Sequence, residues 1–165
     1  MELKTKVVGV TVVVAVFGFL TESHAPLGVF WRAAPGVPDP VGVQLALFML
    51  LGAIEAAALG LGTAFLVFGY PPLDALVSLP ARTTRSAHLA ISWLLMNWWA
   101  HDSFHQHVGM SLTGLLGIEY AFHATLIVAG LVLVNFFLAV VQTPVTAGLE
   151  DSRENICIGV AATEV

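Results

Sequence analysis

The chain has 165 residues, of which 58% are hydrophobic and 10% are charged, and its mean hydropathy is +0.88. This composition lies far outside the range of soluble domains and predicts an integral membrane protein that contacts the lipid bilayer. Six lysines and arginines against eleven acids give a net charge of -5, and this shortage of basic residues excludes nucleic-acid binding.

The first apolar segment is predicted to span about residues 4–21. Its apolar run VVGVTVVVAVFGFL follows Lys4 and Lys6 and is short for a bilayer span, which needs about 20 residues. Together with Ser23-His24-Ala25, the run also resembles a secretory signal peptide. Pro26 directly after that site disfavours cleavage, so we expect an uncleaved anchor whose lysines reach the membrane interface.

The second and third spans are predicted at 41–69 and 86–108. The second ends before Tyr70-Pro71-Pro72, because proline prevents a helix from continuing. The third begins at Ser86, a candidate N-cap, and its purely apolar part is too short to cross a bilayer. We therefore expect this helix to continue through a histidine-rich segment and to end at Gly109.

The fourth span is predicted at 115–142, with Pro144 ending it before a polar tail, 143–165. The fold class expected is all-α: a single domain forming an integral membrane four-helix bundle. Lysine and arginine mark the cytoplasmic side of short loops, and only Arg32 lies on the other side from the rest. Both termini are thus expected in the cytoplasm of a multi-pass cell-membrane protein, with the histidine-rich segment outside.

That segment, NWWAHDSFHQHVG at 97–109, is the most polar part of the apolar region. Successive helical residues turn by about 100°, so His101, Asp102 and His105 fall within one sector of roughly 100°. The next helix carries Glu119 and His123 on one face, at i and i+4. These five residues are the predicted metal ligands, with the two acids either binding the metal or orienting the imidazoles.

Two further histidines are possible additional ligands. His107 lies about 160° around the helix from His105, so it joins only if the helix has frayed. A break of the helix at Trp99 would place the cluster in a loop and would make His24 a candidate as well.

Nitrogen and carboxylate ligands suit copper or zinc, and two or three histidines with one acid are typical of a site with an open position. The single cysteine, Cys157, excludes a CxxC-type site and an internal disulfide. The HDxxH spacing is not the HExxH of zinc proteases. The alternative is that these histidines are solvated interface residues beside an aromatic belt that includes Trp98.

Glu55 lies near the middle of the second span, within LLGAIEAAALGLG. A carboxyl group at that depth is costly, which makes it a proton-relay candidate. The alternative is a protonated acid that hydrogen-bonds to a residue such as Asn97 or Asn135. The glycines of this helix favour close helix packing over phosphate binding. His88 is expected to be an interface residue.

The runs WLLMNWWAHDSFHQHVG and GLLGIEYAFHATLIVAG resemble a group of small four-helix membrane proteins of uncharacterised function. Their shared pattern is WW-x-H-D-x-x-H followed by I-E-Y-x-F-H. The resemblance covers about 92–130 and matches Trp98, Trp99, His101, Asp102, His105, Glu119, Tyr120 and His123. It implies no particular activity, but it does imply that the two polar segments belong together.

The function expected is that of an accessory subunit of a larger membrane metalloenzyme complex, rather than of an enzyme on its own. So small a bundle has little room for a substrate cavity beside a metal, and its apolar faces can meet other subunits or further copies of the chain. Three alternatives stay open: a haem b electron-transfer subunit, a proton or ion pathway through Glu55, and a purely structural subunit.

Overall fold

The computed structural model describes residues 2–22, 25–36 and 38–161, with side chains throughout except at 29, 30 and 144–161. Within these ranges the chain is all-helical and contains no strand, which confirms the predicted class. The elements are α1 (Leu3–Thr21), the 3₁₀ turn η1 (Gly28–Trp31), α2 (Val43–Phe68), α3 (Tyr70–Leu76), α4 (Ala81–Val108), α5 (Leu112–Ile118), the π-helical turn η2 (Glu119–Ala124) and α6 (Thr125–Ala161).

Three helical segments in the described part of the chain are long and apolar enough to cross a membrane. They are α1, α2 and the continuous segment Leu112–Thr143, which joins α5, η2 and the first half of α6. These segments indicate a membrane protein. Helix α4 is as long, but arginines near its start and histidines near its end lower its hydropathy.

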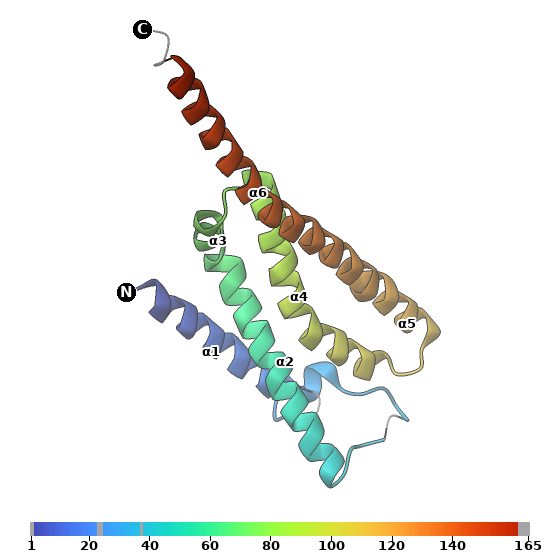
Figure 1. The fold of residues 1–165 in the computed structure, drawn as a ribbon. Helices are drawn as coiled ribbons and strands as arrows, with labels where there is room; N and C mark the ends of the chain where they lie inside the picture. Colours follow the sequence, from blue (N-terminus) through green and yellow to red (C-terminus); the bar gives the residue numbers. More distant parts are fainter. Residues whose placement is uncertain (1, 23–24, 37, 162–165) are drawn as a thin grey trace.

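The long helices pack in a row, in which α1 lies on α2, α2 on α4, and α4 on α6 (Figure 1). Glycines allow the first two contacts to be close, as the glycines of α2 led us to expect. A Cβ atom at Gly60 would overlap the carbonyl oxygen of Thr11 in α1, and one at Gly62 would lie 2.6 Å from Cγ of Met96 in α4. Small residues bring backbones together in this way where lipid supplies no hydrophobic driving force.

Successive helices of the row run in opposite directions (Figure 1). The start of α1 therefore lies beside the end of α2, where Leu3 and Phe68 line one apolar surface pocket. The connection from α1 to α2 and the turn from α4 to α5 lie at the opposite end. That second end carries the histidine-rich segment.

Two helix starts differ from the sequence-based expectation. Pro71 and Pro72 follow the end of α2, but they also occupy the first turn of α3, where a missing N–H costs nothing. Helix α4 begins at Ala81, so Ser86 lies inside the helix and is not its N-cap. As expected, α4 continues through the histidines to Val108, and Gly109 follows with φ of +55°, a conformation that favours glycine.

The last helical segment departs more from expectation. It starts at Leu112, where the Ser111 hydroxyl accepts a hydrogen bond from the Gly114 N–H. It does not end at Pro144, because α6 continues to Ala161. A proline removes a single backbone hydrogen bond, and a helix can be kinked there without being broken. The π-helical turn at Glu119–Ala124 was not predicted at all.

Candidate metal centre

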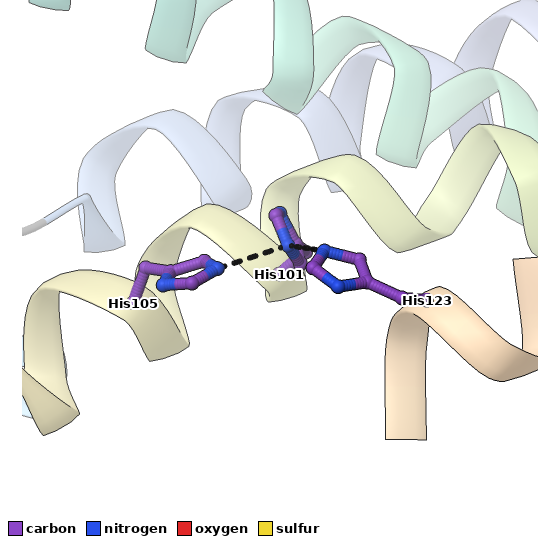
Figure 2. Close-up of side chains that lie close together, drawn as sticks. All are labelled: His101, His105 and His123. Atoms are coloured by element: carbon purple, nitrogen blue, oxygen red, sulfur yellow. Dashed lines mark hydrogen bonds between the residues drawn. The ribbon is translucent and has the colours of Figure 1, made fainter. Parts of the chain in front are cut away.

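Three imidazole rings converge where the end of α4 faces η2 (Figure 2). Nε2 of His101 lies 2.9 Å from Nε2 of His123 and 3.1 Å from Nε2 of His105. One nitrogen from each ring lies within 4.8 Å of the other two, so the three residues could hold a metal ion. We call this group the histidine triad.

The local winding of two helices places the triad. His101 and His105 are one turn apart in α4 and therefore share a face. His123 comes from η2, whose wider winding changes the direction in which a side chain points. Two contacts hold this turn and the start of α6 against α4: Trp93 stacks on Phe122 at 6.2 Å between ring centroids, and its indole N–H donates to the Thr125 hydroxyl at 3.0 Å.

Glu119 orients the third ring. Nδ1–H of His123 donates to Oε2 of Glu119 at 2.7 Å, which leaves Nε2 as the nitrogen that faces the other two rings. A carboxylate behind a histidine in this arrangement fixes the tautomer and makes the opposite nitrogen a better metal ligand. The structure thus gives Glu119 the orienting position, behind the ring and away from the centre of the triad.

Proton counting shows that the three neutral rings are not satisfied by one another. With His123 protonated on Nδ1, its Nε2 can only accept, so His101 must donate to it through Nε2–H. The same His101 nitrogen then has no lone pair left for His105, 3.1 Å away. A metal ion resolves this conflict because it binds all three lone pairs.

One side of the triad is apolar and the other is open. The His101 ring makes edge contacts with Phe122 and Trp98, at 5.7 and 6.4 Å between centroids. By contrast, the side chains of His123 and Glu119 are 40% and 60% exposed. A fourth ligand, such as water, can approach from that open side.

Asp102 lies outside the triad. Its Oδ2 accepts a hydrogen bond from the Gln106 amide at 2.9 Å, and it lines a small cavity with Glu22 of the α1–α2 connection. The sequence argument placed Asp102 within 100° of the two histidines, but a sector of this width faces two different neighbours of α4. His101 and His105 face η2, whereas Asp102 faces α1 and α2.

The two additional candidates do not join the triad either. Nδ1–H of His107 donates to the carbonyl of Arg32 at 3.2 Å, and its ring packs edge-on against Trp31. Trp31 also contacts Trp99 and Phe104, so the 25–36 segment lies across the end of α4. His24 lies outside the described residues.

The remaining polar candidates lie deeper in the helices. Glu55 is 7% exposed, and its Oε2 has no hydrogen-bond partner among the described residues. Neither amide atom of the buried Asn97 is bonded there, and Asn135 is exposed, so the expected hydrogen bond is not seen. His88 is buried between helices: its Nε2–H donates to the Phe65 carbonyl at 2.9 Å.

Comparisons with protein-family models, curated proteins and solved structures gave no match to this chain. The resemblance based on the WW-x-H-D-x-x-H and I-E-Y-x-F-H segments stays a prediction. The site therefore rests on its own geometry, and the histidine triad with Glu119 is the part of the chain where that geometry points to chemistry.

Proposed function

We propose that this protein is an integral membrane four-helix protein that binds one copper or zinc ion through His101, His105 and His123. In this proposal α4 is the fourth span, both termini are cytoplasmic and the triad faces the outside of the cell membrane. The protein acts as an accessory subunit of a larger membrane metalloenzyme complex.

The observation that carries the metal site is the convergence of three Nε2 atoms that cannot all be hydrogen-bonded as neutral rings. Two nitrogens bound tetrahedrally to a zinc ion at about 2.0–2.1 Å stand roughly 3.3 Å apart. The two separations that involve His101, 2.9 and 3.1 Å, are close to that value, and all three nitrogens lie within 4.8 Å of one another, so the rings can close around an ion by side-chain movement. Three nitrogens with an open fourth position suit zinc and copper equally.

The same separations disfavour the haem b alternative. Two axial histidines stand on opposite sides of the iron, so their nitrogens are roughly 4 Å apart, twice a usual metal–nitrogen bond. Nε2 of His101 and His123 are 2.9 Å apart, which leaves no room for a porphyrin between the rings.

The accessory role is supported by the row of helices. Helices α1 and α6 each pack mainly on one neighbouring helix. In the most apolar stretch of α1 only 6% of the residues are buried, and in that of Leu112–Thr143 only 11%. Lipid or other subunits can cover these faces. The open side of the triad lies on the weakly buried segment, so a partner there would approach the metal.

The test is elemental analysis with an absorption spectrum on protein purified without chelator or nickel affinity. We expect about one copper or zinc ion per chain, with less than a tenth of it left in a His105→Ala, His123→Ala double variant. The matched control is His107→Ala, which removes a histidine of the same helix outside the triad and should leave the metal content unchanged. A metal-free wild-type protein that also fails to bind added Zn²⁺ or Cu²⁺ would refute the proposal.

A further inference from the structure

A second polar site lies on the side of α4 that faces α1 and α2, about 100° around the helix from the histidines of the triad. A small cavity of about 10 Å³ is lined by Phe19, Glu22, Phe48, Met49, Gly52, Asp102 and Gln106. This volume is at the lower limit for one water molecule, about 10–15 Å³. The lining brings two carboxylates and an amide together between α1, α2 and α4.

Glu22 is the group that this cavity leaves unsatisfied. Its side chain is 9% exposed, and its Oε1 has no hydrogen-bond partner among the described residues. The carboxyl group fits there because position 52 is a glycine: a Cβ atom at Gly52 would lie 3.2 Å from the Glu22 Cδ and 3.5 Å from Oε1. A buried carboxyl oxygen facing a water-sized space requires a partner there.

The surroundings of Glu22 are acidic. Glu55 is 7% exposed and lies one turn along α2 from Gly52. The negative charge of Asp102, on α4, acts on both Glu22 and Glu55, and Glu22 acts on Glu55 as well. The ion pair found among the described side chains is His123–Glu119, so none of the three acids has a described cationic partner. Three such carboxylates cannot all be ionised without a large cost, because burial penalises each charge and like charges repel.

The pKa of Glu22, which lies just beyond the end of α1, agrees with this picture. Burial, followed by the negative charge of Asp102, raises the pKa of Glu22 to about 7, and a hydrogen bond from Trp99 acts in the opposite direction. Near neutral pH a large share of this group therefore carries a proton.

We propose that Glu22 and Glu55 form a proton-binding site, in which the cavity holds one water that hydrogen-bonds Oε1 of Glu22. The ligand is a proton taken up by a carboxylate to give a carboxylic acid, with the water as its exchange partner. The site is separate from the triad, because its cavity lies between α1, α2 and α4 whereas the triad lies between α4 and η2.

Infrared difference spectroscopy on the full chain in detergent tests this. At neutral pH the wild-type protein should show the carbonyl stretch of a protonated carboxyl group, which moves in D₂O and disappears as the pH rises with a midpoint near 7. Glu22→Gln and Glu55→Gln should each remove part of this band. The control Asp74→Asn, at an exposed acid on α3, should leave it unchanged.

Three results would overturn the proposal. The first is the absence of the band from the wild-type protein between about pH 5 and 7, a result that depends on no variant. The second is a band that both glutamine variants keep in full. The third is a band abolished at constant pH by Na⁺ or Ca²⁺, which would identify the cavity as a metal-cation site. If a glutamine variant does not fold, Gly52→Ala keeps both acids, and its methyl group should shift the band by displacing the Glu22 carboxyl.

Discussion

Nε2 of His101 and Nε2 of His123 lie 2.9 Å apart on two different helices (Figure 2), and Glu119 is hydrogen-bonded to Nδ1 on the far side of the second ring. The two residues are 22 positions apart in the chain, and the contact between α4 and η2 brings them together. Two nitrogens at this distance share one proton or one metal ion. A proton or metal ion held between these two rings therefore links the last helical segment to the other helices of the row.

Replacing Glu119 should weaken the metal site without abolishing it. Glu119→Gln keeps a hydrogen-bond acceptor for His123 but removes the charge that strengthens the ring as a ligand. We expect the dissociation constant for Zn²⁺ to rise roughly 10–100-fold, the usual effect of losing such a partner. Competition of metal-free protein with a chromophoric chelator measures this.

The control for that experiment is Tyr120→Phe, which changes the neighbouring residue, 71% exposed, and should leave the affinity within about twofold of the wild type. Equal affinities of Glu119→Gln and wild type would show that the carboxylate does not support the metal.

Close packing of α1 on α2 should depend on Gly60. In Gly60→Ala the new methyl group would overlap the carbonyl oxygen of Thr11 and lie 3.1 Å from the backbone nitrogen of Ala15, so the helices must separate. Overpacking of this kind costs about 1–3 kcal/mol of unfolding free energy. Reversible unfolding in mixed micelles measures the loss, and Gly9→Ala, which meets nothing within 4 Å, should be neutral or slightly stabilising. Similar stabilities for the two variants would contradict the observed packing.

The stability of the fold should depend on pH through Glu22. Its pKa is raised from 4.5 to about 7 on folding, so between these pH values the folded state binds more protons than the unfolded state. Stability therefore falls as the pH rises through this window. Glu22→Gln removes this contribution, so its melting temperature in detergent should fall less than that of the wild type between about pH 5 and 7.5. Parallel pH profiles of the two proteins would argue against a proton on Glu22.

The distribution of positive charge predicts which end of the row is outside. In a Cys157→Ser background, a cysteine at Met110, which is 88% exposed, should react with an impermeant maleimide added to intact cells. A cysteine at Asp74, on the connection between α2 and α4, should react only after permeabilisation. The reverse pattern would invert the proposed topology and place the triad in the cytoplasm.

Much of the fold could be predicted because composition and periodicity act locally. Apolar length identified the helical segments, and Gly109 ended α4 as expected, since a positive φ there suits only glycine well. The capping of α4 was missed, because a polar residue such as Ser86 is compatible with a helix interior as well as with its start. Pro144 shows the same ambiguity, since proline can kink a helix without ending it.

The site was predictable in part for a similar reason. Spacing alone joined His101 to His105 and Glu119 to His123. It could not say on which side of α4 Asp102 falls, because a sector of 100° is wide enough to face two different neighbours. Nor could it reveal the role of Glu22, which comes from the antiparallel packing of α1 on α2 and from the space above Gly52. Such contacts between distant segments leave no periodic signal in the sequence.

The π-helical turn has a consequence for how the triad is built. Glu119–Ala124 holds more residues per turn than the helices on either side, so it behaves as a one-residue surplus in an otherwise regular rod. Five residues in α-helical winding turn through about the same total angle as six residues wound more loosely, so deleting one residue between Glu119 and His123 would restore α-helical winding and leave α6 in nearly its present orientation. The surplus residue is thus absorbed within the turn, where it sets the four-residue spacing of Glu119 and His123 without changing the direction of the helix that follows.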